Sequence, residues 1–346
     1  MQPLVTVVIP VKNGMRYLAK SLDSIRFQTL REIEIIVIDD ASSDGTFQYL
    51  NSLMDSRLRL LTGKFTCLSE SLNFGIKNST SQYIARMDAD DIAHPQRLEK
   101  QFMLMKKGYT VVGSYCDTID ENETPIGLES RLISDPAIRW GLLFRCEFMH
   151  PSTMFRRDHF IKAGQYNLEY KVAQDYDLWT RMAYFGPLHN TPTPLLQYRK
   201  HSSNISHTRR SEQSKSIGKI AGHYANALDI NIPQSSWYEL HRFLTHGELD
   251  NPSKLVPLAH VFSKARTSFL KQIHEANQET KNAIRTVQNR LRWRCLDSMK
   301  ASSISKVNAA RAIRLFDPDC FSFRTAAKII ADQIPLRISV NKPLRK

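Results

Sequence analysis

Acidic residues gather in residues 83–101, YIARMDADDIAHPQRLEKQ, directly after an apolar run that favours a strand. Residues two apart in an extended segment point the same way, so Asp88 and Asp90 can face one bound ion or ligand. Carboxylate oxygens suit hard divalent cations, Mg²⁺ or Mn²⁺, which commonly share ligands with a diphosphate. An acidic turn after a strand is also an ordinary helix cap, and Asp91 can serve as one. For an isolated D-x-D, helix capping is the favoured interpretation, so a metal site needs support from other motifs.

A second acidic pair, Asp39 and Asp40, ends the most apolar run of the chain, IIVI. A carboxylate there can accept hydrogen bonds from a nucleobase or a ribose hydroxyl, and the following Ser-Ser-Asp-Gly turn supplies backbone donors. A turn with a helix cap is the structural alternative. Ligands of parallel sheets collect at the carboxyl ends of the strands, so we expect residues 10–13, 39–43 and 88–91 to be neighbours. The sequence therefore predicts one cleft that can hold a nucleotide and a metal.

A third acidic pair lies in VAQDYDLWTRM, where Asp175 and Asp177 precede the apolar face of an amphipathic run. Acidic residues in the first turn of a helix are stabilised by the helix dipole, which is the structural interpretation. The functional interpretation is a general base, which needs one carboxylate at the rim of a cleft.

Alternating strands and helices must position these groups. Strands are expected over residues 4–10, 32–39, 57–62 and 83–87, with helices over 15–28, 44–54 and 69–79 between them. This alternation indicates an α/β fold with a mostly parallel sheet flanked by helices. Beyond about residue 206 the chain becomes polar, basic and helical. We predict an α/β domain over residues 1–206 and a mainly helical C-terminal extension over 207–346.

Composition narrows the class of protein. The chain has 346 residues, 42% of them hydrophobic, and its five cysteines form no C-x-x-C pair, which argues against a disulfide framework and a thiolate zinc site. It shows no signal-peptide pattern and no run of about 18 apolar residues. A cytoplasmic protein is the expectation.

The charge is unevenly distributed. Residues 1–198 contain 22 Lys and Arg against 23 Asp and Glu, whereas residues 199–346 contain 26 against 11, a net charge of +15 in the second part. A basic region of this kind meets nucleic acid, anionic lipid or an anionic ligand, or forms a packed cap or a protein-binding surface. We predict that residues 207–346 dock on an anionic membrane surface, at the cytoplasmic face of the inner membrane.

Ordered motifs over residues 4–206 resemble family 2 glycosyltransferases of the type that builds bacterial surface polysaccharides. They are VTVVIPVKNG, IIVIDDASSDGT, YIARMDADDIAHPQRLEKQ, HPSTMFRRD, QDYDLWTRMAYFG and YRKHSSNIS. The resemblance implies a GT-A fold and a nucleoside-diphosphate sugar as donor. It implies transfer with inversion to a hydroxyl of a glycan or lipid-linked acceptor, in the synthesis of O-antigen, capsule or exopolysaccharide.

The resemblance also implies which residues bind the nucleotide. Asp40 matches the position that binds the nucleobase, with Asp39 beside it and Pro10, Lys12 and Asn13 in the first loop. Lys12 departs from the family pattern, because an aromatic residue that could stack on the base is common at this position.

Further roles follow from the same resemblance. Asp88 matches the acid that reaches the ribose and Asp90 the one that holds Mn²⁺ or Mg²⁺ on the diphosphate, while His201 matches a histidine near the diphosphate or metal. Asp175 matches the catalytic base. Apart from the resemblance, the positive charge of Arg86 or Lys12 could assist the departing diphosphate, and Arg86 could equally pair with a neighbouring acid.

Other functions remain as alternatives. A sugar-phosphate nucleotidyltransferase should carry a Gly-rich phosphate loop after the first strand, and IPVKNGMRYL contains one Gly. A nucleic-acid-binding protein should interleave aromatic and basic residues, which the C-terminal region does not do, so no nucleic acid is expected as a partner. Asp88, Asp90 and Asp175 argue against a non-catalytic sugar-binding relative. His150, in a motif shared with the family, is interpreted as structural, with an acceptor-side role as the alternative.

Overall fold

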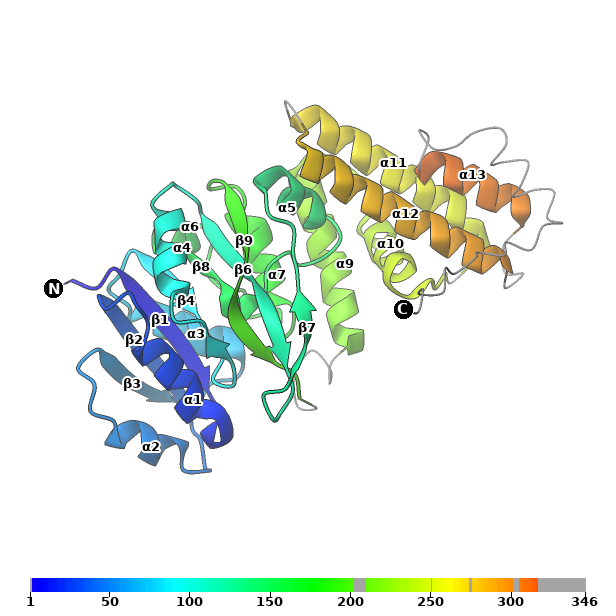
Figure 1. Ribbon diagram of the computed structural model, residues 1–346. Helices are drawn as coiled ribbons and strands as arrows, with labels where there is room; N and C mark the ends of the chain where they lie inside the picture. The colour runs from blue at the N-terminus through cyan, green and yellow to red at the C-terminus, as the bar shows by residue number, and fades with distance from the viewer. Residues whose placement is uncertain (1, 202–209, 250, 274–275, 301–304, 317–346) are drawn as a thin grey trace, which may run out of the picture. The chain divides into compact units, whose positions relative to one another are not determined.

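The computed structural model describes residues 2–201, 210–249, 251–273, 276–300 and 305–316 (Figure 1). The chain forms two compact units, the first comprising Met1–His241 and Ala265–Arg285 and the second Arg242–Lys264 and Thr286–Lys346. The domain boundary predicted between residues 206 and 207 lies outside the described residues, so it stays a prediction.

The first four strands form the parallel part of the sheet, as the sequence predicted. The elements are β1 (Val5–Val11), α1 (Met15–Arg26), β2 (Ile33–Asp40), α2 (Thr46–Ser52), β3 (Leu58–Gly63), α3 (Leu68–Lys77) and β4 (Tyr83–Arg86). The strand order is β3-β2-β1-β4, with every neighbouring pair parallel. All seven residues of β1 except Pro10 are buried, because helices cover both faces of a central parallel strand.

Beyond β4 the sheet becomes mixed. The elements that follow β4 along the chain are β5 (Ile92–Ala93), α4 (Arg97–Met105), β6 (Val111–Ile119), β7 (Pro125–Glu129), α5 (Asp135–Gly141), β8 (Met154–Arg156), α6 (Arg157–Lys162), α7 (Gln174–Met182) and β9 (Leu188–Arg199). β8 joins β4 to β6 through antiparallel pairing on both sides, and β6 pairs with β9 in parallel. The predicted parallel sheet is thus confirmed for the first four strands, and the described sheet as a whole is mixed.

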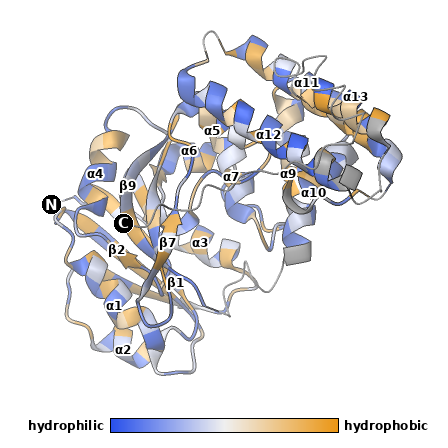
Figure 2. Cartoon of the chain, turned by 45° about the vertical axis from the view of Figure 1, so that its right-hand side comes forward, coloured by the Kyte–Doolittle hydropathy of each residue, from blue (hydrophilic) through white to orange (hydrophobic). Residues whose placement is uncertain are grey.

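The hydropathy of the elements follows this layering. Figure 2 shows hydrophobic residues along the strands and alternating hydrophilic and hydrophobic residues on α1 and α2. On α1, Leu18, Leu22 and Ile25 are fully buried at helical spacing, so one face of this helix packs on the sheet.

The C-terminal region is helical where it is described, as predicted. It contains α9 (Arg210–Ala227), α10 (Gln234–His246), α11 (Leu255–Gln272), α12 (Gln278–Lys300) and α13 (Lys306–Phe316). Within the first unit, the Glu279 carboxylate accepts hydrogen bonds from the backbone N–H groups of Ile133 and Ser134 at 2.6 and 2.8 Å. The beginning of α12 is therefore fastened to the loop before α5. None of the described helices combines the length and the apolar character needed to span a membrane.

Candidate active site

The loops after β1 and β2 meet, as predicted. Lys12 Nζ lies 3.1 Å from Asp40 Oδ2. The Asn13 backbone N–H donates to Ser42 Oγ at 2.8 Å, and Asn13 Oδ1 accepts from the Ser43 backbone N–H at 2.8 Å. Asn13 adopts a left-handed conformation with φ of 53°, which asparagine tolerates better than most residues. These bonds hold the first two loops against each other.

The two acids at the end of β2 lie in different surroundings. Asp39 is 3% exposed, and its Oδ1 accepts from the Ser42 backbone N–H at 3.3 Å, so it stabilises the turn. Asp40 is more exposed and accepts from the Phe65 backbone N–H at 2.8 Å. Asp40 is therefore the better placed of the two to meet a ligand. Pro10 is partly buried within β1.

Phe65 was not among the predicted site residues. Its ring packs over Gly63, where an added Cβ would lie 2.5 Å from a ring carbon, and it contacts the ring of Phe74 at a centroid distance of 5.5 Å. It follows β3, so it reaches the same edge of the sheet as Asp40. That position was the signal that could have identified it.

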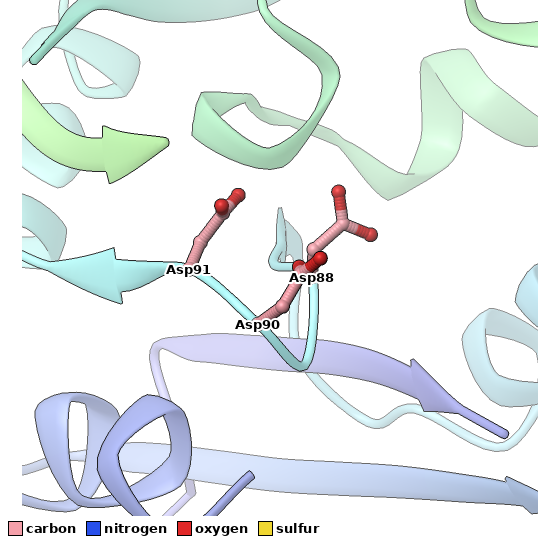
Figure 3. A group of neighbouring side chains, drawn as sticks. All are labelled: Asp88, Asp90 and Asp91. Atoms are coloured by element: carbon pink, nitrogen blue, oxygen red, sulfur yellow. The ribbon is translucent and has the colours of Figure 1, made fainter. Parts of the chain in front are cut away.

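The acidic residues after β4 form a compact group. Asp88, Asp90 and Asp91 each offer a carboxylate oxygen, and these atoms all lie within 4.8 Å of one another (Figure 3). Asp88 and Asp90 are partly exposed and Asp91 is buried. The alternative that Asp91 caps the next helix is wrong, because α4 has Gln96 at its N-cap position. Asp91 Oδ1 instead accepts from the Arg199 backbone N–H at 2.8 Å.

This group of three carboxylates fits a hard divalent cation. All of its oxygens come from carboxylates, the ligand type that Mg²⁺ and Mn²⁺ prefer. Asp91 Oδ2 is buried and has no hydrogen-bond partner among the described residues. Burial raises the pKa of Asp91 well above its ordinary value, and the charges of Asp90 and Asp88 raise it further. A cation would relieve this mutual repulsion.

Three buried arginines surround the acidic group. Arg86, Arg97 and Arg199 are 3%, 0% and 1% exposed. Arg86 Nη2 forms an ion pair with Asp88 Oδ1. Arg199 Nε donates to the backbone oxygen of Asp90 at 2.8 Å.

Arg97 stabilises the backbone at the end of β4. Its Nη2 donates to the Arg86 carbonyl oxygen at 2.6 Å and its Nε to Gln101 Oε1 at 3.1 Å. Burial lowers its pKa to about 10, so the side chain stays charged at neutral pH. Arg97 therefore fixes the end of β4, from which the acidic loop begins.

His201 lies where the resemblance implied, beside the acidic group. Its Nε2 is 2.8 Å from Asp90 Oδ2, and its ring stacks on the Tyr17 ring at a centroid distance of 5.9 Å. The guanidinium of Arg199 also lies over the Tyr17 ring, 4.4 Å from its centroid. Tyr17 thus links α1 to the end of β9, and it orients the imidazole toward Asp90.

Asp175 lies in the first turn of α7, after Ala173 in a left-handed conformation with φ of 59°. Burial raises the pKa of the Asp175 carboxyl, against the lowering effects of the Tyr176 backbone N–H, Arg86 and Cys146. Cys146 Sγ lies 3.7 Å from Asp175 Oδ2. A carboxylate with a raised pKa binds a proton more strongly than an exposed one, which suits a general base.

Asp175 is also electrostatically close to the acidic group. Burial raises the pKa of Asp88, and the charges of Asp90 and Asp175 raise it further, while Arg86 lowers it. The charge of Asp175 therefore acts at the same site as the acidic loop after β4.

His150 and Tyr166 form a neutral hydrogen-bonded pair at this site. His150 Nε2 lies 2.7 Å from the Tyr166 hydroxyl. Burial lowers the pKa of His150 well below its ordinary value and raises that of Tyr166 well above, so both side chains are uncharged at neutral pH. The charges of Arg86, Asp175 and Asp88 act on Tyr166. Sequence reasoning missed Tyr166, which follows no recognisable motif, and favoured a purely structural role for His150.

Together the fold and the site define a class of protein. Parallel strands end at one edge of the sheet, which carries a cation-compatible acidic group, a second acidic strand end and an aromatic ring, as in nucleotide-binding α/β domains. Comparison with known proteins makes the class specific. Residues 6–164 match the Glycosyl transferase family 2. An uncharacterized glycosyltransferase of Haemophilus influenzae is 33% identical over 249 residues, which cover 66% of this chain and 77% of that protein.

The chain therefore belongs to the family 2 glycosyltransferases and is a glycosyltransferase. The O-antigen biosynthesis glycosyltransferase WbnJ of Escherichia coli is 32% identical over 210 residues, covering 58% of this chain and 81% of that protein. Another relative, an uncharacterized glycosyltransferase of Rickettsia felis, is longer, and the chain matches 49% of it.

Solved structures agree on the fold. The crystal structure of S. aureus TarS 1–349 in complex with UDP-GlcNAc has a TM-score of 0.55 and 13% identity, covering 91% of this chain and 90% of that chain. At this identity the likeness shows the fold alone, and it confirms the predicted GT-A fold.

Proposed function

We propose that the protein is an inverting, metal-dependent glycosyltransferase that takes a sugar from a nucleoside-diphosphate sugar. The acceptor is a hydroxyl of a glycan or lipid-linked molecule in cell-surface polysaccharide synthesis. One observation carries the proposal: a cation-compatible acidic group and a half-buried carboxylate at a helix N-terminus, Asp175, lie close enough for their charges to interact. The similarity to an O-antigen biosynthesis glycosyltransferase supports the pathway class. Family membership argues against the nucleotidyltransferase alternative.

The nucleotide end of the donor is assigned to the edge formed by β1, β2 and β3. Asp40 would accept from the nucleobase, with Phe65 offering a ring beside it. Asp39 and Asn13 stabilise the loops that border the nucleobase position. Lys12 lies beside Asp40 and would also contact the nucleotide. The TarS complex with UDP-GlcNAc makes UDP the first nucleotide to test.

The diphosphate end is assigned to the loop after β4. Asp88 would bind the ribose and Asp90, with His201 beside it, the cation. When bound, a divalent cation would stabilise the negative charge that develops on the leaving diphosphate. Arg86 lies within the same group and adds a second positive charge.

Asp175 would act as the base. Inverting transfer is a single displacement, so one carboxylate takes the proton from the acceptor hydroxyl while that oxygen attacks the anomeric carbon. A second carboxylate as nucleophile, needed by retaining glycosidases, is not required. The buried surroundings that raise the pKa of Asp175 favour proton transfer to it.

Two substitutions test these assignments. Asp175→Asn should abolish transfer and retain Mn²⁺-dependent nucleotide binding, because the carboxylate is replaced by a group of the same shape that cannot accept the proton. Asp90→Ala should lose Mn²⁺-dependent nucleotide binding. The measurements are turnover with a panel of UDP-, GDP- and dTDP-sugars, and calorimetric binding of the matching nucleotide. Full turnover of Asp175→Asn would refute its role as base.

We also propose that the C-terminal helices bind an anionic membrane surface. Arg290 and Trp293 are exposed three residues apart on α12, and Trp293 is 46% exposed. On α13, Arg311 and Arg314 are exposed. Tryptophan and arginine together suit the boundary between lipid headgroups and water. Co-sedimentation with vesicles tests this: binding that ignores anionic lipid content and salt would contradict it.

A further inference from the structure

Arg86 has unused hydrogen-bonding capacity inside the site. The side chain is 3% exposed, and Nη2 is engaged with Asp88. Nε and Nη1 are buried and have no hydrogen-bond partner among the described residues. A buried N–H group without an acceptor is costly, so such groups in a native structure indicate an ordered water or a ligand.

The surroundings of Arg86 indicate a ligand with several acceptor oxygens and negative charge. Arg86 pairs with Asp88, and its charge also acts on Asp91 and on Asp175, so both the cation-compatible group and the proposed base lie within reach of its field. A guanidinium donates hydrogen bonds and accepts none, and its planar shape fits the oxygens of a phosphate. The diphosphate of the donor is the group that combines acceptor oxygens with negative charge at this place.

A cation alone would disturb this arrangement. A cation held by Asp90 would weaken the pairing of Arg86 with the nearby Asp88 carboxylate, and it would bring positive charge close to a buried guanidinium. Removing one partner of a buried ion pair is strongly unfavourable, because the other charge stays buried without compensation. If a nucleoside diphosphate arrives with the cation, its negative charge replaces Asp88 as the partner of Arg86.

We propose that Arg86 is an exchangeable counter-ion, which pairs with Asp88 while the donor is absent and turns to the diphosphate when donor and cation bind together. This inference rests on the metal-dependent donor binding proposed above. Its consequence is cooperative binding: the site binds a divalent cation weakly alone and strongly with a nucleoside diphosphate.

The test uses the full chain and measures binding, with no turnover. Mn²⁺ is titrated by calorimetry, and free Mn²⁺ is followed by electron paramagnetic resonance, with and without saturating UDP, GDP or dTDP. For the wild type we expect the matching nucleotide to increase Mn²⁺ affinity at least tenfold, within the range typical of coupled sites. Arg86→Met should bind Mn²⁺ alone about tenfold more tightly than the wild type and lose most of the gain from the nucleotide.

Two control variants accompany this comparison. Arg86→Lys keeps a positive charge at the site and should retain weak binding of Mn²⁺ alone. Arg59→Met removes an arginine that pairs with Glu34 near the beginning of β2, at the other end of this strand from Asp39 and Asp40, and should match the wild type. Circular dichroism and thermal unfolding establish that each variant folds. Equal Mn²⁺ affinity of the wild type with and without nucleotide would overturn the proposal even if Arg86→Met does not fold.

The outcomes separate this inference from the proposed function. Mn²⁺ affinity that is the same with and without every nucleotide would overturn the counter-ion role and leave metal dependence intact. A folded Arg86→Met that binds Mn²⁺ alone no more tightly than the wild type would overturn it as well. Absence of Mn²⁺ binding under all conditions, with nucleotide binding in the presence of chelator, would refute metal dependence itself and this inference with it.

Discussion

The contact between Cys146 and Asp175 permits a prediction in which two variants shift one pH profile in opposite directions. The thiol lies 3.7 Å from Asp175 Oδ2 and also donates toward the Phe148 carbonyl oxygen at 3.4 Å. Its hydrogen bond favours the ionised carboxylate and so lowers the pKa of Asp175, against the larger raising effect of burial. Cys146→Ala should raise the Asp175 pKa, and Cys146→Ser, with a stronger donor, should lower it.

The size of the shift follows from the geometry. A hydrogen bond to a charged group contributes about 1.5–3 kcal/mol, and a thiol is a weak donor whose hydrogen is shared here between two acceptors. We therefore expect about 0.5–1 kcal/mol from Cys146, which corresponds to about 0.4–0.7 pH unit. Since the base must be ionised, kcat/KM falls as pH drops through the Asp175 pKa. The acid limb should move to higher pH in Cys146→Ala and to lower pH in Cys146→Ser.

The assay is the pH dependence of kcat/KM for sugar transfer, with buffers of constant ionic strength. Arg86 and Asp88, whose charges also act near Asp175, are unchanged in both variants, so they contribute equally to each profile. Acid limbs that coincide in all three proteins, or move in the same direction in both variants, would refute the assignment of Asp175 as the titrating base or of Cys146 as its donor.

Three further predictions concern other parts of the molecule. Arg97→Met should destabilise the fold by about 2 kcal/mol or more, measured by denaturant unfolding, because it leaves buried acceptors without a donor; unchanged stability would contradict this. Phe65→Ala should weaken nucleotide binding by about 1–3 kcal/mol in calorimetry, because the base loses its stacking partner. The control Phe74→Ala alters only the neighbouring ring and should have a smaller effect, so equal losses would argue against stacking at Phe65. Trp293→Ala should reduce binding to vesicles rich in anionic lipid by about tenfold, with unchanged transfer to a water-soluble acceptor, and undiminished binding would exclude this tryptophan as an anchor.

The parallel part of the sheet and the meeting of its loops could be predicted because their signals are local. Apolar runs of strand length alternate with amphipathic helical runs, and parallel strands connected by helices end at the same edge. The contacts of Lys12 with Asp40 and of Asn13 with Ser43 follow from that rule alone. Asp175, by contrast, could be placed near the acidic group only through the family resemblance, since 84 positions separate it from Asp91.

The mixed half of the sheet had no comparable signal. β8 has three residues and pairs antiparallel with both β4 and β6, and no local pattern distinguishes it from a parallel strand. The beginning of α12 also belongs to the first unit, through the bonds of Glu279 to the loop before α5. A boundary drawn from composition at residue 206 could not reveal this contact, because hydrogen bonds between distant segments leave no trace in the charge or hydropathy of either segment.

Arg97 and Arg199 were the largest omission, and with Arg86 they change the electrostatic explanation of the acidic loop. Sequence reasoning favoured a bound cation as the positive partner of Asp88 and Asp90, and it gave the pairing of Arg86 with a neighbouring acid as an alternative, which the ion pair with Asp88 confirms. Arg86, Arg97 and Arg199 already supply positive charge around the loop without a bound ion. Arg86 and Arg97 belong to residues 1–198, which are nearly neutral overall, whereas Arg199 belongs to the basic part of the chain. The positive charge beyond Arg199 is the charge that we propose for an anionic membrane surface, and the cation that we propose is a partner of the donor as much as of the protein.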